Sequence, residues 1–338
     1  MKRWETMDNL VSTMSVFPLL QCAAEEGIAV SDLLAGSQLT ESLLCDHERT
    51  VPFDEECVVV SNYMQLTREP HPGLSASAHY HYNCFGVLGA ALVSHPNMLE
   101  ACRFLVRYVA LTFTPFLVTT QEDELTLCAR YLDRLDLGKC REYYLLRDLA
   151  FVRNLCREAD PDHWQQLVSR MDIAMPEPAD SQSIYDFFAW PIRFNADETL
   201  IETHKSALQQ PLRLANPMTL ELMVRQCDEL LVQRQPQSWR ARVESLLLQG
   251  VMDLQLIAEQ CCCSERTLRR HLQREGSSFQ EIALQLLQQR ARQYLKYSRL
   301  SVEVIANRLG YSETAAFAHA FKRWTGRTPS QYRTEAHD

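Results

Sequence analysis

Residues 253–274 read DLQLIAEQCCCSERTLRRHLQR. Apolar residues recur there at helical spacing on either side of a break at 262–264, and they are Leu254, Ile257, Ala258, Cys261, Leu268 and Leu272. Ser264 can cap the second helix, because its hydroxyl can accept a hydrogen bond from a free backbone N–H of the first turn. The stretch therefore predicts a helix-turn-helix unit over residues 254–274.

A second copy of this pattern follows at residues 300–326, which read LSVEVIANRLGYSETAAFAHAFKRWTG. Ser312 occupies the position that Ser264 has in the first copy, 48 residues earlier. Gly310 can supply the left-handed turn, and the stripe expected to be buried is Phe317, Phe321 and Trp324. Two units in tandem are a much more specific signal than one. We predict the second over residues 302–325, with a connecting helix over 279–295.

The face of each second helix that is left free carries polar and basic residues. In the first unit they are Ser264, Arg266, Thr267, Arg269, Arg270 and Arg274, and in the second Ser312, Glu313, Thr314, Ala315, His319, Lys322 and Arg323. A helix fits the major groove of B-DNA, where Arg can donate two hydrogen bonds to guanine and Lys or Arg can neutralise phosphates. We predict base-edge contacts from Arg266, Arg269 and Arg270. Phosphate contacts are predicted from Arg274, Lys322 and Arg323.

Charge is distributed unevenly along the chain. Residues 236–338 hold 15 Lys and Arg against 10 Asp and Glu, a net charge of +5, whereas residues 1–235 hold 19 against 33, a net charge of −14. The total of −9 therefore conceals a basic C-terminal part that suits a polyanion. Charged runs usually only solvate a surface helix. That alternative does not account for the tandem repeat or for the lack of matching acids on the same stripe.

The C-terminal part also carries longer motifs, which are SERTLRRHL at 264–272, GSSF at 276–279, IANRLGYS at 305–312, AFAHAFKRWTG at 316–326 and TPSQYR at 328–333. With them, residues 239–333 resemble the DNA-binding domain of the arabinose-regulator (AraC/XylS) family. The resemblance implies an all-α domain of seven helices over residues 239–338, with recognition helices starting at Ser264 and Ser312. It also implies a regulator, more often an activator, that acts on promoter DNA together with RNA polymerase.

Three positions depart from the family pattern. Cys262 stands where a small turn residue is usual, Leu287 where an Arg is common, and His319 where an Arg is frequent. By the resemblance, the second recognition helix would contribute less sequence specificity than the first.

The N-terminal 215 residues show a different pattern, which predicts a separate α+β domain. Helical spacing is clearest over 11–26, 53–66, 99–112 and 141–158, and strand patterns occur at 116–120, 124–131 and 191–194. Residues 175–186 are predicted to form a loop, because Pro176 and Pro178 are incompatible with a helix.

Looser motifs in this part are GIAVSDLLAG at 27–36, GVLGAALVS at 86–94, ACRFLVRY at 101–108 and FFAWPIRFNA at 187–196. They resemble the sensor domain of one branch of the same family, related to regulators of ornithine use and of mycobacterial virulence genes. The resemblance implies that residues 1–215 bind a small-molecule effector and form a homodimer. Amino-acid, fatty-acid and aromatic effectors all remain open.

Candidate effector contacts lie among the apolar runs of this part. Aromatic side chains can line an apolar pocket, although they more often form the core, and nearby cations would suit an acidic ligand. The candidates are Phe85, Tyr108, Phe188 and Trp190 for the pocket, and Arg103, Arg107 and Arg193 for an acid.

Residues 216–238 connect the two parts. Within them, 216–235 has the pattern of one amphipathic helix, which Pro236 ends. The resemblance suggests a linker or dimer contact, and packing on its own domain is an equally good interpretation.

Several classes of site lack sequence support. No G-x-S-x-G, H-E-x-x-H, G-x-G-x-x-G or P-loop motif occurs, so neither an enzyme nor a bound cofactor is expected. His79 and His81 have metal-ligand spacing in a predicted strand, but structural or pocket-lining roles are favoured. The 12 cysteines include no C-x-x-C pair and are interpreted as reduced thiols, and a metal or redox role for residues 261–263 is disfavoured.

No secretory signal and no apolar stretch of roughly 20 residues is visible, so we expect a cytoplasmic protein with no membrane partner. The function expected is a ligand-responsive, DNA-binding regulator. The alternative is a ligand-independent regulator whose N-terminal part only oligomerises or binds a protein partner.

Overall fold

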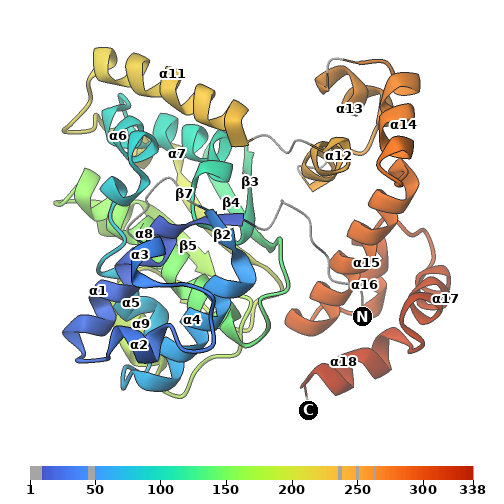
Figure 1. The fold of residues 1–338 in the computed structure, drawn as a ribbon, viewed down its shortest axis with the longest axis horizontal. Helices are drawn as coiled ribbons and strands as arrows, with labels where there is room; N and C mark the ends of the chain where they lie inside the picture. The colour runs from blue at the N-terminus through green and yellow to red at the C-terminus, as the bar shows by residue number, and fades with distance from the viewer. Residues whose placement is uncertain (1–9, 45–49, 235–237, 249–250, 262, 338) are drawn as a thin grey trace. The chain divides into compact units, whose positions relative to one another are not determined.

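The computed structural model describes residues 10–44, 50–234, 238–248, 251–261 and 263–337 (Figure 1). Seven helices form its C-terminal part, and they are α12 (Trp239–Leu248), α13 (Leu254–Gln260), α14 (Glu265–Arg274), α15 (Phe279–Tyr297), α16 (Val302–Arg308), α17 (Thr314–Thr325) and α18 (Pro329–His337). The predicted all-α architecture is confirmed. The two helix-turn-helix pairs are α13 with α14 and α16 with α17, and α15 connects them.

Each pair has its own hydrophobic core. The first core buries Val243, Leu247, Ile257, Ala258, Leu268, Leu272, Ile282 and Leu286. The second buries Ala291, Leu295, Leu300, Ile305, Ala306, Phe317 and Phe321. Because α15 contributes side chains to both, this single helix joins two otherwise separate cores.

The N-terminal part contains a five-stranded sheet in the order β3-β4-β7-β5-β6. Its strands are β3 (Phe116–Glu122), β4 (Thr126–Asp133), β5 (Val168–Asp172), β6 (Ile192–Arg193) and β7 (Thr199–His204). β3 and β4 form an antiparallel hairpin, in which Asp123 accepts hydrogen bonds from the backbone N–H groups of Leu125 and Thr126 at 2.8 and 2.6 Å. A separate antiparallel pair joins β1 (Leu10–Ser12) to β2 (Thr50–Pro52).

Helices make up most of the rest of this part. They are α1 (Phe17–Glu25), α2 (Val30–Leu33), α3 (Glu41–Leu44), α4 (Phe53–Leu66), α5 (Pro72–Ser77), α6 (Val87–Ser94), α7 (Met98–Arg107), α8 (Arg141–Ala159), α9 (Ser181–Phe188), α10 (Lys205–Leu208) and α11 (Pro217–Arg234). Close packing explains one glycine of α6, since a Cβ on Gly89 would lie 1.7 Å from the carbonyl oxygen of Tyr82. The predicted α+β class is therefore confirmed.

Three predicted elements of the N-terminal part were wrong in extent. Residues 11–26 do not form one helix, because 10–12 pair with β2 and a 3₁₀ turn precedes α1. The helix predicted over 99–112 ends at Arg107 and gives way to a 3₁₀ turn, η4 (Val109–Leu111). The loop predicted over 175–186 ends early, because α9 begins at Ser181, once the chain has passed its prolines.

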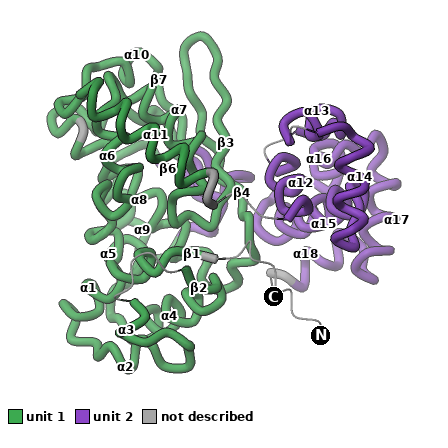
Figure 2. Tube along the Cα trace, turned by 45° about the horizontal axis from the view of Figure 1, so that its top comes forward, with its two compact units in different colours: residues 1–171, 178–191, 201–234 green, residues 172–177, 192–200, 235–338 purple. Residues whose placement is uncertain are grey.

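The chain divides into two compact units (Figure 2). Residues 1–171, 178–191 and 201–234 form the first, and residues 172–177, 192–200 and 235–338 form the second. α11 belongs to the first unit and packs against α6 (Figure 1). One face of α11 therefore packs on its own domain, which was one of the two interpretations of the sequence. Its role as a dimer contact stays a prediction. Within the described ranges, no helix has the length and apolar character needed to cross a membrane.

Candidate functional site

α14, the second helix of the first pair, is capped as predicted. The Ser264 hydroxyl accepts a hydrogen bond from the backbone N–H of Thr267 at 3.3 Å. Leu268 and Leu272 are fully buried, which sets the rotation of the helix about its axis. The basic side chains are left on its exposed face, and they are Arg266, Arg269, Arg270 and Arg274.

The second pair repeats the turn of the first. The backbone N–H of Cys263 donates to the carbonyl of Ala258, and 48 residues later that of Tyr311 donates to Ala306, both at 2.9 Å. Gly310 takes a φ of +83° in this turn, a left-handed conformation that glycine adopts without strain. Cys262, at the corresponding turn of the first pair, lies outside the described residues.

α17, the second helix of the second pair, starts later than the repeat predicts. Its first residue is Thr314, and the preceding Glu313 makes no side-chain cap. Phe317 and Phe321 are fully buried, as expected for the inner stripe, whereas Trp324, the third residue of that stripe, is only partly buried. Of the DNA contacts predicted in the second pair, Thr314 is half-buried. The others are exposed, and they are Ser312, Glu313, Ala315, His319, Lys322 and Arg323.

One arginine of α14 has an acidic partner that the sequence analysis did not anticipate. Arg269 lies 3.4 Å from Glu265, one turn earlier on the same helix. Both side chains are largely exposed, and a pair of this kind contributes only about 0.3–0.5 kcal/mol. Within the described residues, Arg266, Arg270 and Arg274 make no ion pair. The exposed face of α14 can therefore present donors to an anionic partner at little cost.

A cavity of about 60 Å³ lies inside the first unit. Its wall comes from η3 (Tyr82–Phe85), α7, the following 3₁₀ turn, β3, β4 and α8. Most of the lining is apolar, and the Phe85 ring stacks on Phe113 and meets Phe151, with centroid distances of 4.7 and 4.8 Å. This is the general character of a site for a small molecule.

Arg147 of α8 brings positive charge into this wall. Its side chain is only 2% exposed. The guanidinium lies over the rings of Tyr80 and Tyr144, at 5.2 and 4.9 Å from their centroids. It also donates to the carbonyl oxygen of Phe113 at 3.0 Å. Arg147 is thus held on several sides by protein groups.

Two carboxylates flank this guanidinium. Asp148 Oδ1 lies 2.9 Å from Nε of Arg147 and 2.8 Å from Nη2, and Glu56 Oε1 lies 3.5 Å from Nη1. Ser15 donates to the other oxygen of Glu56 at 3.0 Å, whereas Asp148 Oδ2 is buried without a hydrogen-bond partner among the described residues. Burial raises the pKa of Glu56 to about 7, although the charge of Arg147 opposes this. Once Glu56 ionises, the cluster holds more negative than positive charge.

The cations proposed from the sequence for an acidic effector do not line this cavity. Arg103 is bonded to Glu100 and Glu122 at the surface, with distances of 2.6 to 2.9 Å. Arg107 is 68% exposed and lies 3.6 Å from Asp228. Arg193 holds both oxygens of Asp172, at 3.1 and 2.5 Å. Each of these cations already has a carboxylate partner.

The proposed aromatic contacts divide between two places. Phe85 lines the cavity. Tyr108, Phe188 and Trp190 are buried outside its lining, and Phe188 and Trp190 pack together with ring centroids 5.9 Å apart. Of the seven candidate effector contacts, the structure therefore brings only Phe85 to the cavity.

Sequence reasoning missed the charged cluster around Arg147. One signal could have identified it, because an Arg-Asp pair interrupts the apolar stretch YYLLRDLAF at residues 143–151. A charged pair within an apolar helix must find partners when it is buried. Glu56 had no such signal, since it lies 91 residues away along the chain.

His79 and His81 do not converge on one site. They lie in an irregular segment before η3, not in a strand. His79 Nε2 is 3.0 Å from Glu25, and His81 Nδ1 is 2.7 Å from Glu158. The shared face that a metal site would need is therefore not formed.

Comparison with known proteins places both parts of the chain. Residues 27–212, more than half of the chain, match the arabinose-binding domain of AraC transcription regulators, and residues 257–335 match a helix-turn-helix domain. The chain is similar to the ornithine utilization regulator of Pseudomonas aeruginosa, with 26% identity over 319 residues that cover 93% of this chain and 94% of that protein. An uncharacterized HTH-type transcriptional regulator of Mycobacterium tuberculosis is 27% identical over 331 residues, 93% of each chain.

A solved structure shares the fold. The crystal structure of the transcriptional regulator CdpR from Pseudomonas aeruginosa aligns with a TM-score of 0.50 and 24% identity, over 95% of this chain and 98% of that one. These relatives are transcription regulators, and none is described as an enzyme. The chain therefore belongs to the AraC family of DNA-binding transcription regulators, with an arabinose-binding-type domain followed by a helix-turn-helix domain.

Proposed function

We propose that this regulator binds a small-molecule effector in the cavity of its N-terminal part and activates promoters that carry paired half-sites. The cavity, with its apolar lining and few polar groups, is the observation that carries the effector proposal. On this proposal the effector binds to the domain formed by residues 1–215, which also forms the homodimer. Residues 216–238 link this domain to the DNA-binding domain. Residues 239–338 bind promoter DNA and act together with RNA polymerase. An effector that prefers one state of the regulator shifts the population toward it and so changes the affinity for DNA.

Mapping of the protein's binding sites across its own genome, followed by a reporter placed behind the strongest site, tests this proposal. Discrete peaks that share a repeated half-site are expected. In the reporter strain, Val106→Phe should abolish the response to growth conditions, because Val106 lines the cavity and a larger side chain would fill it. A ligand-independent regulator would keep its response in this variant.

Arg270→Ala is expected to weaken binding to the best half-site by about 1–3 kcal/mol and to relax the preference at one base pair, because a bidentate contact to guanine is lost. Arg269→Ala should behave in the same way. Arg323→Ala should instead weaken all sequences alike and lower the salt-dependence slope by about 1, as expected for a phosphate contact. Competition binding against single-base variants at two salt concentrations measures both effects.

Gln280→Ala is the control, because Gln280 is an exposed, uncharged residue of α15, outside both recognition helices. It should leave affinity and base preference unchanged. Unaltered base discrimination in both the Arg269 and the Arg270 variants would refute the proposed division between base and phosphate contacts.

We also propose that α11 contributes to a homodimer. Met218 and Leu222, one turn apart, are 84% and 51% exposed and form an apolar row on this helix, while Cys227 on its inner side is fully buried. Two-fold pairing with the same row of a second copy would cover these side chains in both. Leu222→Glu is therefore expected to yield monomers in analytical ultracentrifugation and to weaken binding to paired half-sites.

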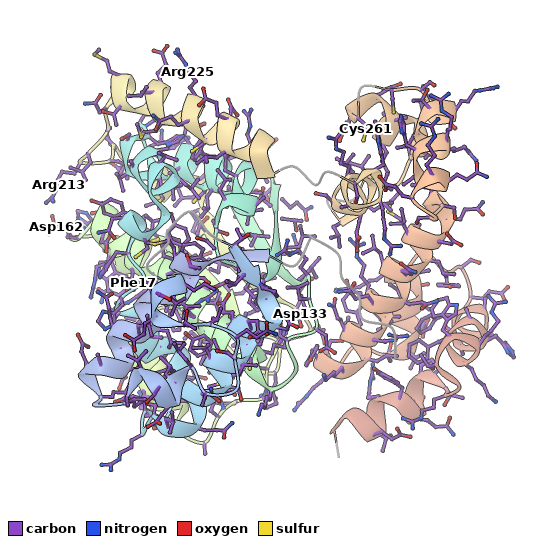
Figure 3. The ribbon with its side chains drawn as sticks, in the orientation of Figure 1. Phe17, Asp133, Asp162, Arg213, Arg225 and Cys261 are labelled. Atoms are coloured by element: carbon purple, nitrogen blue, oxygen red, sulfur yellow. The ribbon has the colours of Figure 1, made fainter. Side chains whose placement is uncertain are left out.

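Arg225→Ala is the control for this variant. Arg225 projects outward from the same helix (Figure 3), and its side chain is 69% exposed. Its replacement removes no apolar surface, so the dimer should persist. A dimer that also survives Leu222→Glu would mean that the contact lies elsewhere.

A further inference from the structure

The cavity wall offers no free cation to a ligand. Among its described lining residues Arg147 is the only cation, and its three nitrogens already face Asp148, Glu56 and the Phe113 carbonyl. A carboxylate ligand placed here would therefore meet an arginine whose charge is already balanced by protein carboxylates. It would also add negative charge beside two buried carboxylates, which is unfavourable because like charges repel.

Negative charge, by contrast, exceeds positive charge in this cluster once Glu56 is ionised. Asp148 lines the cavity, and its side chain is 11% exposed. Its Oδ1 accepts both contacts from Arg147, whereas Oδ2 has no donor within the described part of the chain. A buried acceptor that lacks a donor is uncommon, because it forfeits its hydration without replacement. A ligand that carries both an N–H donor and a positive charge would supply the missing hydrogen bond to Oδ2 and balance the second carboxylate.

The size of the cavity limits the rest of the ligand. The cavity volume of about 60 Å³ is smaller than the roughly 150 Å³ of a cavity that admits benzene, so a slim hydrocarbon chain suits it better than a ring. We propose that the cavity binds a small aliphatic amine, with its hydrocarbon chain against Phe85, Phe113 and Phe151 and its ammonium group beside Asp148. This inference rests on the proposal that the cavity is the effector site, and it specifies the chemical class of the effector.

Glu56 decides the conditions for the test. Because burial raises its pKa to about 7, Glu56 is mostly ionised at about pH 8, where an alkylamine still carries its charge. The cluster then holds Glu56 and Asp148 against Arg147 alone, and the electrostatic preference for a cation is largest.

Thermal unfolding and calorimetric titration of the full-length protein at this pH, with n-butylamine, 1-butanol and butyrate at matched ionic strength, provide the test. The three probes have similar hydrocarbon chains and differ in charge. n-Butylamine should raise the Tm and bind at least about tenfold more tightly than 1-butanol, since a charge-assisted hydrogen bond replaces a neutral one. Butyrate should give no shift.

Two variants separate the contributions of charge and space. Asp148→Asn should make n-butylamine bind no better than 1-butanol. Val106→Phe, which changes no charge, should abolish the shift with both probes. Glu142→Gln is the matched control, because Glu142 is an exposed carboxylate of the same helix and does not line the cavity, and it should bind n-butylamine as the native protein does.

The outcomes distinguish this inference from the proposed function. Binding of 1-butanol or butyrate as tightly as n-butylamine would overturn the amine inference and still support a ligand site. No binding of any probe would also overturn it, and the reporter response of Val106→Phe then decides separately whether the cavity is the effector site.

Discussion

Arg147→Met is expected to lower the free energy of unfolding of the N-terminal unit by about 3–5 kcal/mol, because it leaves buried carboxylates without their counter-ion. Arg147 is 2% exposed and sits between Glu56 and Asp148. Methionine keeps much of the volume of the arginine stem, so the loss should report mainly the missing charge and hydrogen bonds. Denaturant unfolding, followed by circular dichroism, measures the change.

The destabilisation should depend on pH in a defined direction. Burial already raises the pKa of Glu56 from 4.5 to about 7. A carboxyl group whose pKa is raised on folding binds more protons in the folded state, so its contribution to stability is greatest below its ordinary pKa and is lost as the pH rises to about 7. Without Arg147 the pKa of Glu56 should rise further, because the positive charge that opposes the effect of burial is removed. Arg147→Met should therefore cost more at about pH 8 than at about pH 5.

Arg170→Met provides the matched control. Arg170 pairs with Glu202 at 3.1 Å, but its side chain is 46% exposed, so the loss should stay below about 1 kcal/mol. Combining Arg147→Met with Glu56→Gln and Asp148→Asn should recover part of the lost stability, because no unpaired charge then remains buried. If Arg147→Met and Arg170→Met lower the free energy of unfolding equally, the buried cluster contributes no more to stability than an exposed ion pair does.

The C-terminal helices could be predicted closely because local signals agree there. Ser264 caps α14, Gly310 makes the left-handed turn, and α15 begins at Phe279 as its pattern indicates. The start of α17 was less predictable. Ser312 resembles Ser264 in sequence, but the helix starts at Thr314, so a capping residue type alone does not decide where a helix begins.

The N-terminal part was less predictable because its elements depend on distant partners. Residues 10–12 form a strand only by pairing with residues 50–52, a contact that periodicity cannot reveal. Burial of Arg147 is a similar case. An arginine on a helix is usually exposed, and only the fold brings Glu56 of α4 to it. The effector candidates chosen by residue type were therefore placed outside the cavity, with the exception of Phe85.

Phe321→Ala is expected to lower the stability of the second helix-turn-helix unit by about 3–5 kcal/mol, the usual cost of removing a buried phenyl ring. Phe321 is fully buried and contacts the rings of Phe317, Trp324 and Tyr332, with centroid distances of 5.3 to 6.3 Å. Since the second core is separate from the first, amide hydrogen exchange should accelerate in α16 and α17 and much less in α13 and α14.

Leu272→Ala in the first core should cost about 2–5 kcal/mol and accelerate exchange in α13 and α14 more than in α16 and α17. His319→Ala is the control, because His319 is exposed, and it should change exchange in neither pair of helices. The two core variants also make different predictions for DNA. If each pair reads its own segment of a half-site, Phe321→Ala should shorten the footprint at one end and Leu272→Ala at the other. Loss of protection in both pairs at once would mean that α15 couples the two cores into one cooperative unit, and that neither pair binds DNA without the other.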